Sequence, residues 1–135
     1  MTTEVTITVD ARNAQADALA RKLDDGSVKI YDGTPPANVD AALSGNTLLA
    51  TNELSATSAP AASAGAITFN TISDDVSIDA DGTASFYRSY ETDGVTAVTQ
   101  GSVGTTGSGE SMIIATGLVL VEAEVFEIAS WVHTV

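Results

Sequence analysis

The sequence has no cysteine, one histidine, one tryptophan and only five basic residues among 135. Without cysteine it has no disulfide framework, no thiol nucleophile and no zinc–thiolate site. Its 18 acidic residues against five basic ones give a formal net charge of −13, and such a surface repels the phosphates of nucleic acid. The longest apolar stretch, at 118–121, is far short of the roughly 20 residues that span a bilayer. These features argue against a nucleic-acid or membrane partner.

The N-terminal region predicts a strand followed by a helix. Residues 3–9 alternate, with Val5, Ile7 and Val9 on one face, which is typical of a half-buried strand. Asp10 is the expected N-cap of a helix over 11–23, whose alanine and leucine residues recur at helical spacing, and Gly26 stops it. The start also lacks the basic and apolar regions of a secretory signal, so we expect a soluble protein made in the cytoplasm.

After Gly26 the pattern is β-like to the end. Strands are expected at 27–31, 47–54, 66–70, 83–91, 95–103, 111–115 and 121–135. Asp93-Gly94 predicts a type I′ hairpin turn that pairs Tyr90 with Ala97 and Phe86 with Gly101. The predicted fold is mainly β, an antiparallel β-sandwich of jelly-roll or Greek-key type with one short N-terminal α-helix. Residues 1–25 form a possible docking arm and residues 26–135 the sandwich body.

No set of residues predicts an enzyme. The single histidine, His133, lies near the C-terminus, where a strand end holds an imidazole poorly against a nucleophile. The acidic pair Glu122 and Glu124 is expected on a solvated strand face rather than in a sugar cleft, because aromatic residues are scarce. Asp79 and Asp81 resemble the start of a calcium loop, but position twelve is Tyr90 instead of glutamate. We therefore expect no catalytic residue, cofactor or metal.

The charge is distributed unevenly along the chain. Residues 1–29 hold four basic and five acidic side chains (4 − 5 = −1), whereas residues 30–135 hold one and 13 (1 − 13 = −12). Copies of the protein would repel one another least through the N-terminal part. This favours docking of that part on a partner, with the alternative that the helix only packs on the protein's own core.

Several stretches carry a resemblance to a family. Residues 28–36 (VKIYDGTPP), 47–50 (TLLA), 82–88 (GTASFYR) and 101–104 (GSVG) are similar to small virion proteins of tailed phages and prophages, over about residues 10–135. Some members of that family are capsid cement, or decoration, proteins. The resemblance implies a β-rich, non-enzymatic protein of the virion surface that trimerises and stabilises the lattice of the major capsid protein.

An alternative assignment is a phage tail or fibre module, or a host-surface module that binds glycans through the loops at 32–39 and 104–110. The residues expected at a partner or subunit interface are two apolar N-terminal residues, three cations of the helix and two aromatic residues. They are Val5, Ile7, Arg12, Arg21, Lys22, Phe126 and Trp131. For the two aromatic residues, burial in the protein's own core is the competing expectation.

Overall fold

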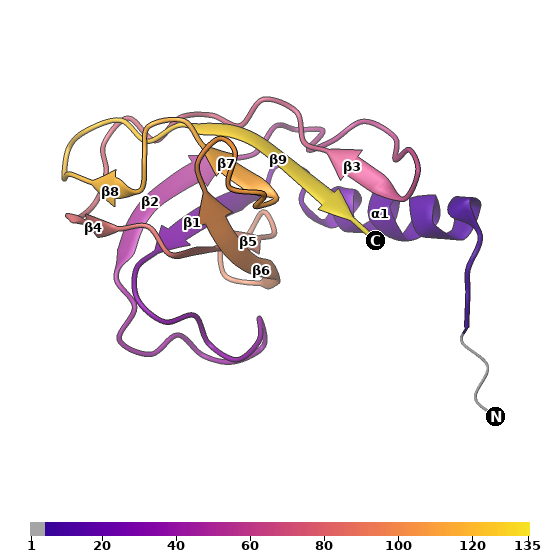
Figure 1. The fold of residues 1–135 in the computed structure, drawn as a ribbon, viewed down its shortest axis with the longest axis horizontal. Coiled ribbons are helices and arrows are strands. Elements are labelled where there is room, and N and C mark those ends of the chain that lie inside the picture. The colour runs from indigo at the N-terminus through magenta and orange to yellow at the C-terminus, as the bar shows by residue number, and fades with distance from the viewer. Residues whose placement is uncertain (1–4) are drawn as a thin grey trace.

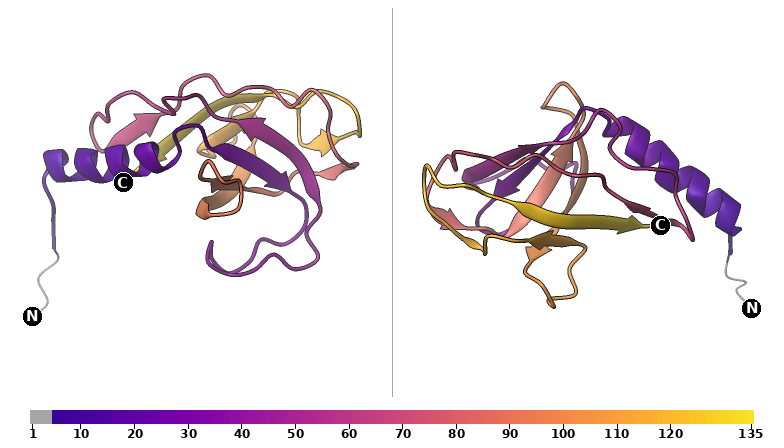
Figure 2. Two further views of the ribbon diagram at one scale, coloured as in Figure 1. Left: turned by 180° about the vertical axis from the view of Figure 1, so that it is seen from behind. Right: turned by 90° about the horizontal axis from the view of Figure 1, so that it is seen from above.

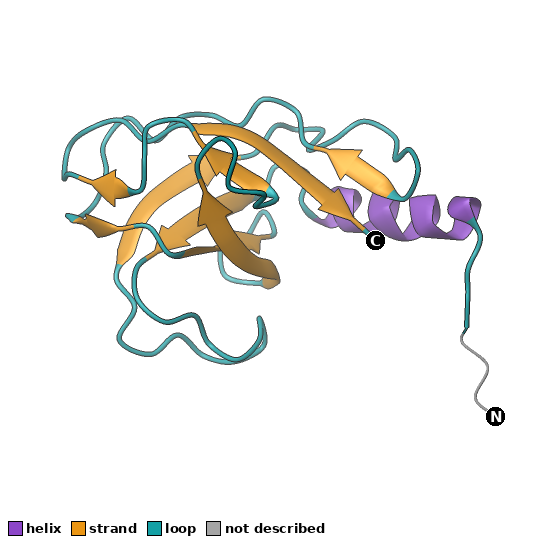
Figure 3. Cartoon of the chain, viewed as in Figure 1, coloured by secondary structure: helices purple, strands orange, loops and turns teal. Residues whose placement is uncertain are grey.

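The structure is a computed structural model, and it describes residues 5–135. The chain forms a curled sheet with one helix beside it (Figure 1). The helix is α1 (Val9–Lys22), and it precedes all of the strands. The strands are β1 (Ser27–Tyr31), β2 (Leu48–Glu53), β3 (Ala66–Thr68), β4 (Gly82–Thr83), β5 (Phe86–Tyr90), β6 (Ala97–Gly104), β7 (Met112–Ile114), β8 (Val119–Leu120) and β9 (Ile128–Thr134). The expected class, mainly β with one short helix, is confirmed (Figure 3).

The main sheet has seven strands in the order β2-β1-β5-β6-β7-β9-β3, and β4 and β8 form a separate pair. The sheet is mixed rather than wholly antiparallel, because β6 and β7 run parallel. A parallel connection normally needs a dozen or more residues, whereas here residues 105–111 suffice. Gly107 and Gly109 make this tight return possible, since both adopt positive φ (87° and 83°).

The sheet curls until its edge strand β2 meets the chain that leads into β9. Residues 73–79 cover the free edge of β2, with the Ser73 N–H donating to Glu53 O and the Asp79 N–H to Leu49 O. Asp75 then forms an antiparallel bridge with Phe126. This closure leaves β2 without an open edge, which protects it from pairing with other chains.

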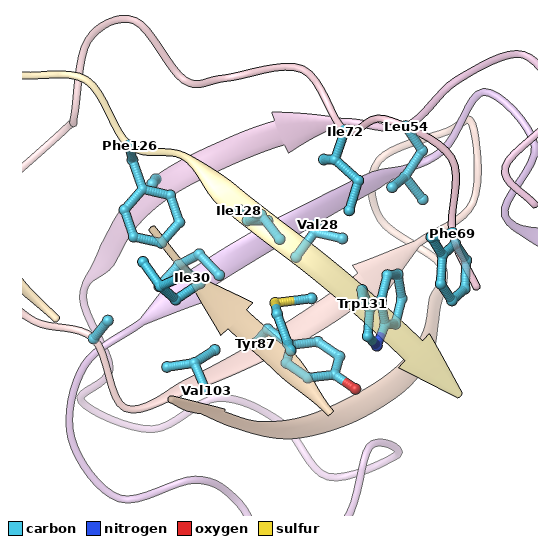
Figure 4. Packing of buried hydrophobic residues seen from close by; sticks show 14 of the residues in the cluster. Val28, Ile30, Leu54, Phe69, Ile72, Tyr87, Val103, Phe126, Ile128 and Trp131 are labelled. Carbon is cyan, nitrogen blue, oxygen red and sulfur yellow. The ribbon is translucent and has the colours of Figure 1, made fainter. Parts of the chain in front are cut away.

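The inner face of the curled sheet holds the hydrophobic core (Figure 4). Trp131, 1% exposed, stacks on Phe69 with ring centroids 3.8 Å apart and meets the edge of Tyr87 at 5.2 Å. Tyr87 lies opposite Gly101, where an added Cβ would come within 2.8 Å of the tyrosine hydroxyl. Glycine is therefore required in the middle of β6, because its missing side chain makes room for the ring.

The outer face of β1 and β5 is buried as well, because residues 32–46 fold back over it. Tyr31 stacks on Phe86 there, with ring centroids 5.4 Å apart. Arg88, 5% exposed, holds the loop by donating to the carbonyl oxygens of Asn38 and Ala41. Burial on both faces explains why β5 has no polar–apolar alternation.

The β5–β6 hairpin differs from its prediction in turn type and register. Tyr90 does pair with Ala97, but a bulge beside it shifts the pairing, so that Phe86 lies opposite Ser102. Gly94 has positive φ (72°) whereas Asp93 does not, so the turn is not type I′. The Asp93 carboxylate instead accepts the N–H groups of Val95 and Thr96 and stabilises a wider loop.

The expected strand over 3–9 is wrong for its described part, and residues 3 and 4 lie outside the described residues. Residues 5–8 pair with no strand of the described chain, and Val9 begins the helix. Thr8, not Asp10, is the N-cap, and its hydroxyl accepts the Ala11 N–H at 3.1 Å. Because Thr8 caps the helix, the residues after it are helical, and the strand that the alternation predicted up to Val9 does not form.

The C-terminal strand is also shorter than expected. Over 121–127 the chain makes a turn, in which Ala123 adopts a positive φ of 69°, and only residues 128–134 form β9. Glu122 and Glu124 therefore lie on an exposed turn instead of sharing one strand face.

We expect the protein to lose stability in alkaline solution because of its buried tyrosines. Burial, reinforced by the Tyr90 hydroxyl 3.0 Å away, raises the pKa of Tyr31 far above its ordinary value of 10.0, and burial also raises the pKa of Tyr87. A raised folded-state pKa contributes stability below pH 10 that is lost as the pH rises beyond it. Urea denaturation at several pH values should give a constant free energy of unfolding up to about pH 9 and a decline above about pH 10. The Tyr31→Phe variant should show a shallower decline, and an equal decline in both proteins would contradict the assignment to Tyr31.

Candidate functional site

Helix α1 is fixed to the loop before β3 by three polar side chains on one helix face, spaced four residues apart, and by Asp24 just after the helix ends. Each of them hydrogen-bonds to the backbone of residues 58–65. The contacts are Asn13 Oδ1 with Gly65 N–H (2.8 Å), Asp17 Oδ1 with Ala62 N–H (2.7 Å), Arg21 Nη2 with Ala59 O (2.8 Å) and Asp24 Oδ1 with Ser58 N–H (2.8 Å). Because the adjacent face buries Ala16, Ala20 and Leu23, the helix belongs to the folded body.

We call helix α1 together with residues 54–73 the neutral lobe. Residues 54–73 contain no charged side chain, and α1 contains three basic and two acidic ones (3 − 2 = +1). The other described residues, 5–8, 23–53 and 74–135, contain two basic and 15 acidic side chains (2 − 15 = −13). Folding therefore gathers the uncharged run onto the helix and leaves the acidic charge on the rest of the body.

The three cations expected at an interface all lie on α1, in different environments. Arg21 is 2.9 Å from Asp24 in an ion pair on a partly exposed surface. Arg12 is half-buried beside Gly65, and Lys22 is exposed. Of the three, Lys22 is the best placed to meet a partner.

Val5 and Ile7 are exposed, at 87% and 41%, on the chain that leads into the helix. Phe126 and Trp131 are buried in the protein's own core instead, at 0% and 1% exposed. An interface anchor must offer accessible area, so neither aromatic ring can serve as one in this fold. Phe126 is held inside by the bridge to Asp75, and Trp131 by its stack on Phe69.

The candidate metal residues do not converge. Asp81 Oδ1 accepts the Glu122 N–H at 2.7 Å, which gives this carboxylate a structural role in the turn. The Asp79 N–H donates to Leu49 O and closes the edge of β2. Within residues 5–135, no three acidic or histidine side chains are grouped as metal ligands. His133 lies within β9 opposite Ile67, where partial burial lowers its pKa.

The two loops of the glycan-binding alternative are held by internal contacts. Gln100 Nε2 donates to Pro36 O at 2.9 Å, so residues 32–39 are bound to the sheet. Ser102 donates to the Glu110 carboxylate at 2.7 Å at the base of the second loop.

Sequence reasoning missed two features of the surface. The first is the lobe segment 54–73, for which the run of 20 uncharged residues was a readable signal. The second is a set of exposed valines, 76, 119, 121 and 125. Three of them line one surface cavity, and Val76 follows the bridge of Asp75 with Phe126. The strand β8, which carries Val119, lies at the end of the molecule away from α1 (Figure 1; Figure 2 gives two further views). Its members come from separate loops and the short strand β8, so no local pattern indicates them.

The fold and surface thus define a mainly β protein with a neutral lobe and an acidic body. In the described residues no helix is both long and apolar enough to cross a membrane. Comparisons with family models, curated proteins and solved structures found no match to this chain.

Proposed function

We propose that the protein is a structural component of a phage virion, a decoration protein that binds the outer surface of the capsid and stabilises the lattice of the major capsid protein. In this role it performs no catalysis, and the neutral lobe faces the shell. The observation that carries the proposal is the segregation of charge between the lobe, at +1, and the rest of the described chain, at −13.

Charge segregation supports docking because the centres of protein interfaces are depleted of charged side chains. Small, uncharged residues over 54–65 can approach another protein without the desolvation of ions. The acidic body would then face solvent and keep decorated particles apart through like-charge repulsion. The shell enters this proposal as the partner that the resemblance of residues 28–36 to virion proteins implies.

Binding to a repeating capsid lattice also explains how a small contact surface on each copy can give stable attachment. If several copies associate, each contact with the shell raises the effective concentration of the next one, and the combined affinity exceeds that of any single contact. The helix-to-loop hydrogen bonds hold the lobe rigid, so little conformational entropy is lost when it binds.

Binding to empty shells tests the proposal. Shells assembled from the major capsid protein of the same genome should bind the purified protein saturably at lattice positions, and their melting temperature should rise. Cryo-electron microscopy of the decorated shell should show the neutral lobe against it. Absence of binding, or binding without added shell stability, would contradict the decoration role.

Reversing the charge of Lys22 should weaken shell binding. Lys22→Glu changes the charge of the lobe by two units in the negative direction, and we expect an affinity about tenfold lower, measured by co-sedimentation with shells. The matched control is Thr105→Glu with Thr106→Glu, which makes the same change of charge on an exposed loop of the acidic body. Equal losses in both proteins would place the contact elsewhere than on the lobe.

A further inference from the structure

Residues 69–75 run antiparallel to the chain that enters β9, and this pair is bonded at its two ends but open in the middle. At one end the Phe69 N–H donates to Trp131 O at 2.9 Å. At the other end Asp75 and Phe126 exchange two backbone hydrogen bonds, of 2.8 and 3.0 Å. Between these ends no backbone hydrogen bond joins the two stretches, so the strand pair contains an opening.

The opening exists because residues 70–73 are bonded to the chain on their other side. Three hydrogen bonds hold them to residues 53–58. They join the Asn70 N–H to Ser58 O (2.8 Å), the Ser55 hydroxyl to Thr71 O (2.8 Å) and the Ser73 N–H to Glu53 O (3.0 Å). The fold itself therefore holds the opening in place.

A cavity of about 430 Å³ occupies the opening. Its floor consists of four residues of the hydrophobic core, each at most 8% exposed (Figure 4). They are Phe69, Ile72, Ile128 and Trp131. The walls are polar, and their charged side chains are Asp74 and Glu127, with no basic side chain in the lining. The cavity thus combines an apolar floor with negative charge.

Asp74 and Glu127 occupy opposite positions of the antiparallel pair, because the residues next to them, Asp75 and Phe126, form the bridge. Like charges at opposite positions of neighbouring strands destabilise a sheet. Within residues 5–135 neither carboxylate has an ion-pair partner. A positive charge between the two carboxylates would remove this repulsion.

A buried acceptor lies beside the same end of the cavity. Asn52 is 0% exposed, and its Nδ2 donates to Ser73 O at 2.9 Å and to Phe126 O at 3.2 Å, in the residues that precede Asp74 and Glu127. The Oδ1 atom of Asn52 has no hydrogen-bond partner in the described chain. Since a buried acceptor without a donor costs free energy, this region lacks hydrogen-bond donors as well as positive charge.

We propose that the cavity receives an arginine side chain of the partner on which the neutral lobe docks. Arginine carries five N–H donors and a permanent positive charge at the end of an apolar stem. The stem lies on the apolar floor, and the guanidinium lies between the carboxylates of Asp74 and Glu127. A bare metal ion would leave the apolar floor unused. For the source of the arginine the inference rests on the proposed function, because residues 68–72 of the lining belong to the neutral lobe.

A second copy of this chain is a poor source of the arginine. The sequence contains three arginines, and the fold engages each of them. Arg12 is half-buried beside Gly65, Arg21 is paired with Asp24, and Arg88 is 5% exposed. The proposed occupant therefore belongs to a different protein.

Titration with N-acetyl-arginine amide tests the cavity without any shell. Nuclear magnetic resonance of the full chain should show saturable shifts of the amides over 70–74 and 127–131. N-acetyl-citrulline amide has nearly the same shape but no charge, and it should bind at least about tenfold more weakly. Absence of saturable shifts with the arginine probe, or equal affinity for the two probes, would overturn the proposal.

Neutral substitutions locate the binding. The double variant Asp74→Asn with Glu127→Gln alters two exposed side chains, so the fold is retained, and it should bind the arginine probe at least about tenfold more weakly. The matched control is Glu122→Gln with Glu124→Gln, which removes the same charge from the exposed turn before β9 and should bind like the wild type. Unchanged binding by the cavity variant, or an equal loss in the control, would place the arginine elsewhere.

Co-sedimentation with shells separates this inference from the decoration role. When the wild type binds shells, the cavity variant should bind at least about tenfold more weakly and the control variant equally well. Tight shell binding by the cavity variant would show that the shell supplies no arginine to the cavity, and it would leave the decoration role intact. A wild type that binds the arginine probe but no shell would contradict the decoration role and the shell as the source of the arginine.

Discussion

Replacing Trp131 by alanine should lower the free energy of unfolding by about 3–5 kcal/mol, the largest effect that we expect of any single substitution. The indole is 1% exposed, lies flat against Phe69 and meets the edge of Tyr87. Its removal deletes both ring contacts and leaves a cavity in a core that cannot collapse, because β7 and β9 hold the surrounding backbone.

Urea denaturation followed by far-UV circular dichroism measures this effect, since the variant lacks the only tryptophan and its fluorescence. The neighbouring Val132→Ala is the control: its side chain is 36% exposed, and we expect a change of no more than about 1 kcal/mol. If Trp131→Ala instead kept its stability and lost only self-association, Trp131 would be a subunit anchor and the core assignment would be wrong.

Replacing Arg88 by methionine should lower the free energy of unfolding by about 3 kcal/mol and release residues 32–46 from the sheet. The Arg88 guanidinium donates to Gln100 Oε1 at 2.8 Å, to Ala41 O at 2.6 Å and to Asn38 O at 3.2 Å. Methionine fills similar space but donates none of these hydrogen bonds. A buried guanidinium without a carboxylate partner is favourable only while these acceptors surround it, and the acceptors in turn depend on it.

Hydrogen exchange gives a second measurement of the same substitution. Amides over 32–46 should exchange faster in Arg88→Met, whereas those of the β7–β9 core should keep their relative protection. The control is Lys29→Met, which removes the cation opposite Arg88 on β1. Lys29 is less buried and donates to Gly94 O, so we expect a loss of about 1 kcal/mol and no change over 32–46. Unaltered exchange of the loop in Arg88→Met would show that the remaining contacts, such as that of Gln100 Nε2 with Pro36 O, are enough to hold it.

Lys29 and Arg88 show how far the sequence can be interpreted. Local pattern predicts both of their strands, and β1 has the expected bounds. The pattern cannot show that these two cations lie directly opposite each other, a pairing that repels, or that each is drawn to a different loop carbonyl. On the other side of β5, the register with β6 depends on the bulge between Ser89 and Tyr90, where a single extra residue changes every partner beyond it.

The charge imbalance is readable from the sequence, but its location in space is not. The sequence places the near-neutral part at residues 1–29, and the structure adds residues 54–73 to it through the hydrogen bonds of α1. Contacts between residues 34 to 52 positions apart create that surface, and such long-range contacts leave no periodic signal.

By itself the sequence determined the properties that depend on composition and on neighbouring residues: no thiol chemistry, a strongly acidic chain, one N-terminal helix, though not its capping residue, and most of the strands. Tertiary structure alone decided which faces are buried, and so moved Phe126 and Trp131 from candidate anchors into the core and left Val5 and Ile7 outside it. The physical reason is that burial depends on what the rest of the chain places against a side chain. Composition and periodicity describe the side chain, and only the closed sheet determines its surroundings.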